Sequence, residues 1–342
     1  MAPARAALEI KQTGAAVVVA RIERPRLGVQ HEWSRATVNH IRFFDDNAKQ
    51  VLLPDSQLEK VATGAIWSEG PVWISEEQCL LWSDIPNNRM LRWSEPNGLS
   101  VWRDQVDFTN GHCRDLDGHI LHCSHGKRAI IRTRLLDGLA QTVDEVLVDT
   151  YQGRRLNSPN DVIVKRDGTI WFTDPPYGIL SDREGYKAES ELRHNYVFRF
   201  DPAINSLSVA SDYVDEPNGL AFSPNERILY VSDTSAALRP EGQGNHHIVA
   251  FNVDAAGVLS APRVFAQINP GLPDGFRLDT QGWLYISSES GVQIYHPDGT
   301  RLAEIPVPEK VGNLTFGGQG NDWLYICAST SLYRIQLNTK GQ

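Results

Sequence analysis

The sequence predicts an all-β protein, a six-bladed β-propeller with a metal site in its central channel. The first observation is a short polar residue, usually followed by glycine, that occurs six times: Glu69, Asn110, Asn160, Asn218, Asp274 and Asn313. The second is an apolar, strand-like run that begins ten or eleven residues after each of them. A fixed offset of this kind defines a repeat. Six units of three or four strands, without a convincing long helical period, indicate a propeller.

Each unit contains the same succession of strands and turns. After the polar residue, the chain runs through an apolar stretch to a turn of hairpin chemistry, at residues 115–118, 165–168, 223–225, 279–282 and 317–320. The second strands mix aromatic and β-branched residues and close on a small or acidic polar pair, at residues 80–84, 120–124, 170–174, 229–233, 284–288 and 324–328. Third strands are expected at residues 89–93, 129–133, 196–200, 247–251, 291–295 and 331–335.

The repeat favours one domain over residues 36–342, preceded by an N-terminal extension at residues 1–35. The first unit begins near residue 60, so the strand-like segment within residues 36–53 is free to add a strand to the last blade and close the ring. Two longer insertions, residues 175–195 and 234–246, each follow a strand that ends in Asp. We expect them to be mobile surface loops that cover a ligand and set its identity.

Composition excludes several classes of partner. The formal net charge is −9 and no dense Lys/Arg stripe occurs, which argues against a nucleic-acid partner and a polybasic membrane contact. The apolar stretch at residues 14–20 is too short for a transmembrane helix and makes a poor signal peptide. Four scattered cysteines are too few for a disulfide framework, so the cytoplasm is the expected location, with the periplasm less favoured. In an exported protein Cys113 and Cys123 could pair, and the oligomeric state is open.

Equivalent positions on the inner strands of a propeller face one another across the central channel. Glu69, Asn160, Asn218 and Asp274 are therefore expected to present two carboxylates and two amide oxygens to a common point. This oxygen-only set suits one divalent cation, Ca²⁺ first, with Zn²⁺, Mg²⁺ or Mn²⁺ as alternatives. The simpler interpretation is that Asn-Gly and Asp-Gly only form turns, which explains each pair singly but not the common offset.

Five segments make the chain resemble a known family. They are Ser-Glu-Gly-Pro-Val-Trp at 68–73, Asn-Ser-Pro-Asn-Asp at 157–161, Trp-Phe-Thr-Asp-Pro-Pro-Tyr-Gly at 171–178, Glu-Pro-Asn-Gly-Leu-Ala-Phe-Ser at 216–223 and Pro-Asp-Gly at 273–275. Over roughly residues 55–335, the chain resembles the family of senescence marker protein (regucalcin), gluconolactonase and luciferin-regenerating enzyme, particularly its bacterial gluconolactonase-like branch.

The resemblance implies a single divalent cation in the channel, held by the residues that match Glu69, Asn218 and Asp274. Asn160 would be a fourth ligand or a substrate contact, and Asp274 would also be the general base or acid of lactone hydrolysis. One position departs from the family pattern, because animal members carry arginine two residues before the asparagine, where this chain has Ser158. Arg155 is out of register, so the substrate-binding role of that arginine is not transferred to it.

The chemistry of lactone hydrolysis suits these residue types. Negative charge builds on the carbonyl oxygen of an ester during hydrolysis, and a divalent cation stabilises it as a Lewis acid. A carboxylate such as Asp274 takes a proton from the attacking water and returns it to the ring oxygen, which leaves as an alcohol. The sequence has no Gly-x-Ser-x-Gly element and no dinucleotide-binding Gly-x-Gly-x-x-Gly, so a serine nucleophile and a dinucleotide cofactor are not expected.

Other polar residues are weaker candidates for substrate binding. Asn110 and Asn313 hold the equivalent blade positions and could bind sugar hydroxyls, although a structural role is favoured. Asp174 and Tyr177 lie on the insertion side, where substrate contact and a capped strand end explain them equally well. Four histidines lack a zinc-binding spacing with a third ligand and are expected to be structural or on the surface: His122, His125, His246 and His247.

Three functions compete. The leading hypothesis is a metal-dependent lactonase that acts on a sugar-derived aldonolactone. The second is a related propeller hydrolase of aryl or phosphate esters, because the same Lewis-acid site would serve any activated ester. The third is a non-catalytic propeller that binds Ca²⁺ for rigidity and uses its faces to bind a protein or sensory ligand, since one fold supports many functions.

Overall fold

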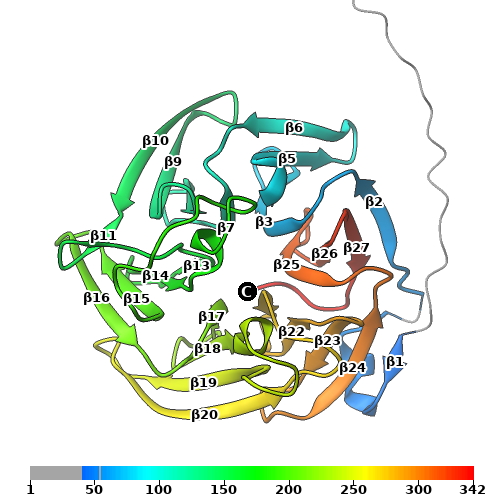
Figure 1. The fold of residues 1–342 in the computed structure, drawn as a ribbon. Helices are drawn as coiled ribbons and strands as arrows, with labels where there is room; N and C mark the ends of the chain where they lie inside the picture. Colours follow the sequence, from blue (N-terminus) through cyan, green and yellow to red (C-terminus); the bar gives the residue numbers. More distant parts are fainter. Residues whose placement is uncertain (1–40, 54) are drawn as a thin grey trace, which may run out of the picture. The chain divides into compact units, whose positions relative to one another are not determined.

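The computed structural model describes residues 41–53 and 55–342 and confirms the six-bladed β-propeller. Six antiparallel sheets stand radially around a central channel, each with its first strand innermost (Figure 1). The second and third strands of every repeat lie where the sequence predicts them. The proposed N-terminal extension, residues 1–35, lies outside the described residues, so the domain boundary stays a prediction.

The blades follow one another along the chain. Blade one has β3 (Ser68–Ile74), β4 (Cys79–Asp84), β5 (Arg89–Ser94) and β6 (Gly98–Asp104), and blade two has β7 (Thr109–Arg114), β8 (Ile120–Ser124), β9 (Ala129–Asp137) and β10 (Gln141–Val148). The short pair β11 (Thr150–Tyr151) and β12 (Arg154–Arg155) precedes blade three, which has β13 (Val162–Val164), β14 (Ile170–Asp174), β15 (Tyr196–Asp201) and β16 (Ser206–Ser211).

The second half of the ring repeats this order. Blade four has β17 (Pro217–Phe222), β18 (Ile228–Asp233), β19 (His247–Val253) and β20 (Leu259–Gln267). Blade five has β21 (Phe276–Leu278), β22 (Leu284–Ser287), β23 (Gly291–Tyr295) and β24 (Arg301–Pro306), and blade six has β25 (Val311–Gly317), β26 (Trp323–Ala328) and β27 (Ser331–Gln336). The described helices are four short 3-10 turns, η1 (Asp46–Gln50), η2 (Ile85–Asn87), η3 (Tyr177–Ile179) and η4 (Ser235–Leu238).

The ring closes through a different strand from the one predicted. The outermost strand of blade six is β2 (Glu59–Thr63), which pairs antiparallel with β27, from Glu59 opposite Arg334 to Thr63 opposite Ser331. The expectation that residues 36–53 supply this strand is wrong. Their described part forms β1 (Arg42–Phe43), which pairs with β24 of blade five, and η1, which packs its buried Ala48 against blades five and six. Four residues separate β2 from β3, so β2 joins the first blade directly to the last.

The core lies between the blades. The described residues form six apolar clusters, and each one fills the space between two neighbouring sheets. Trp82, Trp171, Tyr230, Tyr285 and Tyr333 are the largest fully buried side chains, and each comes from a second or third strand. This explains the aromatic and β-branched composition of those strands, because both faces of the middle of a blade are covered.

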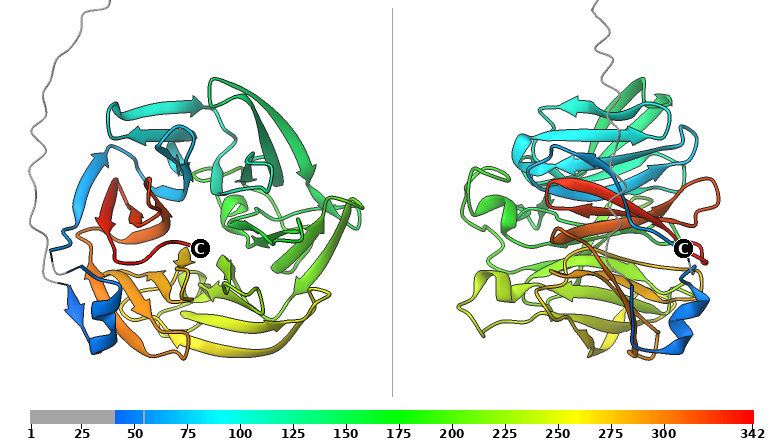
Figure 2. Two further views of the ribbon diagram at one scale, coloured as in Figure 1. Left: turned by 180° about the vertical axis from the view of Figure 1, so that it is seen from behind. Right: turned by 90° about the vertical axis from the view of Figure 1, so that its right-hand side faces the viewer.

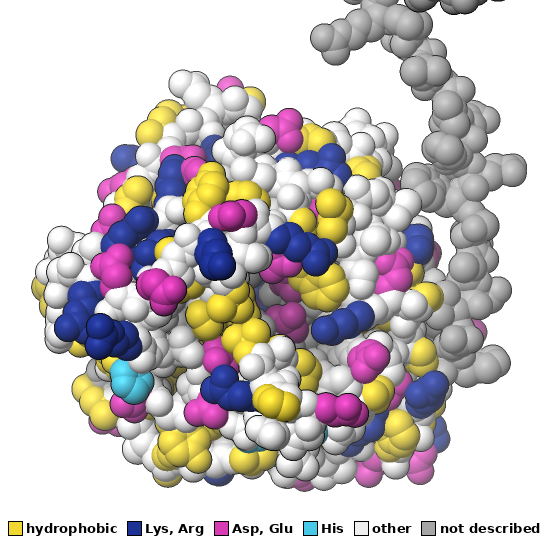
Figure 3. Space-filling model, viewed as in Figure 1, with side chains coloured by type: hydrophobic (Ala, Val, Ile, Leu, Met, Phe, Trp, Pro, Cys, Tyr) yellow, Lys and Arg dark blue, Asp and Glu magenta, His cyan; other side chains and the backbone are white. Residues whose placement is uncertain are grey.

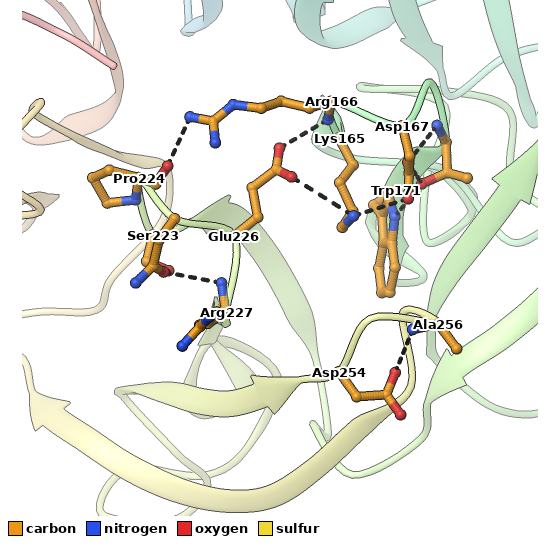
Figure 4. A network of polar contacts seen from close by, with 12 residues as sticks. Lys165, Arg166, Asp167, Trp171, Ser223, Pro224, Glu226, Arg227, Asp254 and Ala256 are labelled. Carbon is orange, nitrogen blue, oxygen red and sulfur yellow. Dashed lines mark hydrogen bonds and ion pairs between the residues drawn. The ribbon is translucent and has the colours of Figure 1, made fainter.

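Polar contacts join the hairpin turns of neighbouring blades. The backbone N–H of Arg166 donates to Glu226 at 2.8 Å, and the Arg166 guanidinium donates to the Pro224 carbonyl at 2.7 Å (Figure 4). The Lys165 ammonium lies 2.8 Å from Asp167 and 3.6 Å from Glu226. The sequence predicted both segments as turns, and the structure shows that they also fix blade three against blade four.

The two long insertions lie on one face of the propeller, and the C-terminus lies on the other (Figure 2). Each insertion begins with a 3-10 turn, η3 in blade three and η4 in blade four. All four cysteines are free thiols, so Cys113 and Cys123 do not form a disulfide. Over residues 41–53 and 55–342, no helix reaches the length and apolar character that crossing a membrane requires.

Candidate functional site

Bulges in the inner strands mark the positions of the six repeated polar residues, which we call the ring residues. The antiparallel register shifts at or beside a ring residue in four blades, between Glu69 and Val72, Thr109 and His112, Pro217 and Leu220, and Val311 and Asn313. In blades three and five, the ring residues Asn160 and Asp274 come two residues before β13 and β21. A bulge re-aims the side chain beside it and is common next to functional sites.

Hydrogen bonds between blades hold the ring residues in place. The hydroxyls of Ser83, Thr173 and Ser232, near the ends of second strands, donate to the backbone carbonyls of Asn110, Asn218 and Asp274 in the following blade, at 3.0, 2.6 and 2.8 Å. In these three blades the small polar ending of the second strand therefore has a structural purpose that the sequence alone did not reveal.

The glycine that follows a ring residue allows this close contact. Gly70 has a φ of +52°, and a Cβ at this position would lie 2.1 Å from the carbonyl oxygen of Asn110. No side chain fits there without moving the backbone. The Asn-Gly and Glu-Gly pairs thus bring neighbouring blades together at the channel, in addition to any role in turns.

Five of the six ring residues line one cavity of about 390 Å³ on the face that carries the insertions: Glu69, Asn110, Asn160, Asn218 and Asp274. Acidic side chains lie within a central hollow of this face, with Lys and Arg side chains around it (Figure 3). Asn313 is not among the lining residues. Its side chain packs against Gly275 and accepts a hydrogen bond from the Leu314 N–H at 2.8 Å, so the structure supports the structural interpretation of Asn313.

The two ring carboxylates resist ionisation. Burial, and after it repulsion from Asp274, raises the pKa of Glu69 well above its usual range. Burial raises the pKa of Asp274 to about 7, with Lys310 opposing the rise and Asp161 adding to it. Buried carboxylates that share a site without a compensating charge hold their protons in this way. A cation between them would stabilise both charged forms.

Some other buried acids of the protein are paired with arginine, whereas these two carboxylates are not. Asp84 pairs with Arg89 at 2.9 Å and Asp161 with Arg277 at 3.2 Å. Within the described residues, no Lys, Arg or His nitrogen lies within the 4.0 Å ion-pairing distance of Glu69 or Asp274. An unpaired acidic pair beside amide oxygens fits a hard divalent cation.

A cation bound at this site would have amide oxygens as ligands as well as carboxylate oxygens. No group of three or more His, Cys, Asp or Glu side chains in the described part of the chain is arranged to hold a metal. Glu69 and Asp274 are the two acids among the four predicted ligands, so Asn160 and Asn218 would have to supply the other oxygens. Such a mixed set favours Ca²⁺ over softer metals, because Ca²⁺ accepts carboxylate and amide oxygens alike.

Asp161 is an acidic residue near the site that the repeat pattern does not single out. It directly follows the ring residue Asn160. At the equivalent position four blades have glycine and blade six has Leu314. Its carboxylate accepts from the Val162 N–H at 3.0 Å and from Arg277 of blade five at 3.2 Å. The Asp161–Arg277 ion pair therefore crosses the channel and joins blade three to blade five.

Of the two candidates on the insertion side, the structure brings Tyr177 into the cavity but not Asp174. Tyr177 lines the cavity from η3, and its hydroxyl is buried without a hydrogen-bond partner among the described residues. Asp174 is fully buried, and its carboxylate accepts from the Asn157 N–H at 2.8 Å. Its carboxylate therefore holds the chain before Asn160 in place, and it lies outside the cavity lining.

Several lining residues were not anticipated from the sequence. His125, interpreted as structural or on the surface, lies in the cavity wall, as do Trp67 and Lys310. The Lys310 ammonium stands over the Trp67 ring at 5.6 Å from its centroid. The two insertions contribute Arg183, Glu184, Thr234 and Ala237. Both insertions therefore line the cavity, and their covering of a ligand stays a prediction.

The comparison with known proteins decides the family. Residues 67–330 match the model of the SMP-30/gluconolactonase/LRE-like region. The chain belongs to this family. Among curated relatives of this SMP-30/gluconolactonase/LRE-like protein, the gluconolactonase of Zymomonas mobilis subsp. mobilis is 32% identical, over 90% of this chain and 88% of the relative. The pentonolactonase of Haloferax volcanii is 28% identical, over 78% and 82% of the two chains.

Solved structures agree with this assignment. The structure of a gluconolactonase from Xanthomonas campestris matches with a TM-score of 0.79 and 41% identity, covering 87% of this chain and 95% of that one. These relatives are named as lactonases, and they match this chain over most of its length. This family member is therefore a lactone-hydrolysing enzyme with a small-molecule substrate.

Proposed function

We propose that this protein is a divalent-cation-dependent lactonase that hydrolyses a sugar-derived aldonolactone. The observation that carries the proposal is the acidic pair of buried Glu69 and partly buried Asp274, which has no ion-pair partner among the described residues, in a cavity lined by ring amides. One cation, best matched by Ca²⁺, would be bound by Glu69, Asn160, Asn218 and Asp274. The gluconolactonase and pentonolactonase relatives support a sugar lactone as the substrate class.

In this mechanism Asp274 moves the proton. A divalent cation bound at the site would supply Lewis-acid stabilisation of the charge on the carbonyl oxygen. Asp274 takes a proton from the water that attacks the lactone carbonyl. As the acyl–oxygen bond of the ring breaks, Asp274 returns the proton to the ring oxygen, which leaves as a hydroxyl of the product acid. Without a cation the pKa of Asp274 is about 7, and a bound cation would lower it, so the carboxylate would be ionised and able to accept the proton at neutral pH.

The other lining residues would hold and enclose the substrate. A cavity of about 390 Å³ accommodates a monosaccharide lactone, since small-molecule sites start near this size. Asn110 and Asn160 offer amide groups to sugar hydroxyls, and Tyr177 and Thr234 approach from the insertions. All four cysteines are free thiols, which is compatible with the cytoplasm as the proposed location.

A substrate panel tests the proposal. Protein supplied with Ca²⁺, Mg²⁺, Mn²⁺ or Zn²⁺ is assayed by proton release with glucono-1,5-lactone and pentonolactones, and by absorbance with an aryl acetate and an aryl phosphate. We expect kcat/KM to be at least about 100-fold higher for one of the lactones, because the cavity binds the sugar hydroxyls as well as the ester. A preference for an aryl or phosphate ester would identify the second hydrolase function. No turnover by protein whose melting temperature rises with the cation would favour a binding propeller.

Tyr177 provides a separate prediction. Burial raises the pKa of Tyr177 well above its usual range, so its hydroxyl stays a hydrogen-bond donor. We expect Tyr177→Phe to lower kcat/KM for the preferred lactone by roughly tenfold, the effect of losing one hydrogen bond to substrate. The melting temperature should stay the same or rise slightly, because the hydroxyl has no partner within the described residues to lose. Full activity of the variant would show that the hydroxyl does not contact the substrate.

A further inference from the structure

His125 connects the blade-three insertion to a ring residue. Its Nδ1 lies 2.7 Å from the backbone carbonyl oxygen of Glu184, and its Nε2 lies 3.2 Å from the side-chain amide nitrogen of Asn110. His125 is 1% exposed and Asn110 is 4% exposed, so bulk water does not compete for either contact. Both residues also line the cavity that holds Glu69 and Asp274.

These contacts determine which nitrogen of His125 carries the proton. A carbonyl oxygen can only accept a hydrogen bond, so Nδ1 must be the donor to Glu184. In a neutral imidazole Nε2 is then without a proton and accepts from the NH₂ group of Asn110. Burial lowers the pKa of His125 to about 4, which keeps the ring neutral over the physiological range.

The orientation of the Asn110 amide follows from this tautomer. With its NH₂ group held by His125, the Oδ1 atom must point the other way. None of the described residues donates a hydrogen bond to Oδ1, whereas the backbone carbonyl of Asn110 is already bound to Ser83 at 3.0 Å. The opposite orientation would set an Nε2–H against Oδ1 and leave Nδ1 as a lone pair facing the Glu184 carbonyl, which is repulsive in a buried site.

We propose that His125 is a positioning residue that fixes Asn110 with its Oδ1 toward the cavity, where this oxygen accepts a hydrogen bond from a hydroxyl of the lactone. The inference rests on the proposed lactonase function for the identity of the ligand. It adds to that function that Asn110 presents a hydrogen-bond acceptor, and not a donor, to the substrate. A substrate whose matching hydroxyl is replaced by hydrogen or a methoxy group then cannot donate and is selected against.

The blade-three insertion takes part in this arrangement through its backbone. The Glu184 carbonyl reaches His125 because the insertion is held against blade two, where the Tyr186 and Phe108 rings pack edge to face with centroids 5.3 Å apart. The Gly178 N–H also donates to Ser158 at 2.9 Å, which fixes the start of the insertion. The loop therefore contributes to substrate selection through His125 as well as through its own side chains.

The first test concerns the free protein and does not depend on turnover. Nitrogen-15 NMR of labelled histidine distinguishes the two neutral tautomers and the imidazolium, with the His125 signals assigned by their loss in His125→Gln. We expect the neutral Nδ1–H form at pH 6–8. An Nε2–H tautomer or an imidazolium in this range would overturn the inference, whether or not the protein proves to be a lactonase.

The second test measures substrate preference in variants. Gln at position 125 can donate to Glu184 and accept from Asn110, whereas Leu can do neither. We compare kcat/KM for the preferred lactone, the parent, with kcat/KM for each of its monodeoxy analogues. We expect His125→Leu to lower kcat/KM about tenfold for the parent, but to change it little for the analogue that lacks the hydroxyl bound by Asn110. His125→Gln should recover most of the loss and the preference for the hydroxyl. Equal losses for the parent and every analogue would overturn the inference.

A matched control removes a neighbouring buried histidine. His122 lies on β8, is 4% exposed and contacts Thr133 at 2.7 Å, away from the cavity lining. His122→Leu should change the melting temperature without changing the ratio of kcat/KM between parent and deoxy lactone. The melting temperature and the Ca²⁺ affinity of each position-125 variant show that it is folded with an intact cation site. If the wild-type protein hydrolyses no lactone, the proposed function fails, and the NMR result still decides the tautomer.

Discussion

Asp274→Asn is expected to reduce lactone turnover by about 10³-fold or more while the propeller stays folded. The substitution removes the group that accepts and returns the proton, a role that typically contributes 10²- to 10⁴-fold to the rate. It also removes one of the two negatively charged carboxylates from the proposed cation site. Because Asn has the same shape and eliminates repulsion with Glu69, the cation-free variant should melt at the same temperature as the wild type or higher. Initial rates by proton release and calorimetry with EDTA measure both effects.

Asp279→Asn is the matched control for this prediction. Asp279 is a second acid of blade five whose pKa is raised mainly by burial, and its side chain is fully buried. Its carboxylate accepts from the Trp283 N–H at 2.9 Å and from the Thr339 hydroxyl at 3.0 Å, outside the cavity. This variant should lose stability, because an amide cannot accept all of these bonds, but keep its activity. Asp274→Asn with wild-type turnover would refute the role of Asp274 as the base.

The sequence predicts the propeller well because its signal is repeated six times. Most second strands carry a similar aromatic and β-branched pattern, and an error in one repeat is corrected by the other five. The closing strand has no such support. β2 and the segment near Arg42 both have strand-like sequences, and the choice between them depends on the distance each must span across the ring, which no local pattern contains.

The ring residues were found from the sequence because they recur at one offset, and five of them do line one cavity. The site residues that the sequence did not reveal each occur in one blade and have no repeated counterpart. His125 lies just after a second strand and reaches the cavity only because it sits beside the blade-three insertion. Arg277 meets Asp161 across the channel over a separation of 116 residues. Contacts that depend on the meeting of different blades carry no periodic signal, so they needed the structure.

Removal of the cation is expected to abolish lactone turnover, and the effect should be reversible. EDTA-treated protein should have less than about 1% of the original kcat, since Lewis-acid stabilisation of the carbonyl oxygen contributes several kcal/mol to the barrier. Titration with Ca²⁺, Mg²⁺, Mn²⁺ and Zn²⁺ should restore it and rank the metals. Full activity in protein shown to be free of metal by elemental analysis would refute cation dependence.

The same titration performed at several pH values should show weaker cation binding in acid. The cation binds the ionised carboxylates, whereas the pKa of Asp274 is about 7 and that of Glu69 is raised well above its usual range. Below pH 7 the cation must therefore displace protons, and its affinity should fall by about tenfold per pH unit for each proton displaced. Calorimetry in buffers of different ionisation enthalpy counts those protons directly. Affinity that is constant from pH 5 to 8 would show that these carboxylates are not the ligands.

The stability of the cation-free protein should change with pH in the opposite direction. Acids whose pKa is raised by folding bind more protons in the folded state than in the unfolded state, so the protein loses stability as pH rises from about 4 toward 7. Added Ca²⁺ at 100 times its dissociation constant should return about 2.7 kcal/mol at pH 8. Asp174 and Glu216 also have pKa values raised to about 7 by burial, and they add a slope that the cation leaves unchanged. The difference between melts with and without Ca²⁺ therefore isolates Glu69 and Asp274, and it should become smaller in Asp274→Asn, where Glu69 is the one ring carboxylate left.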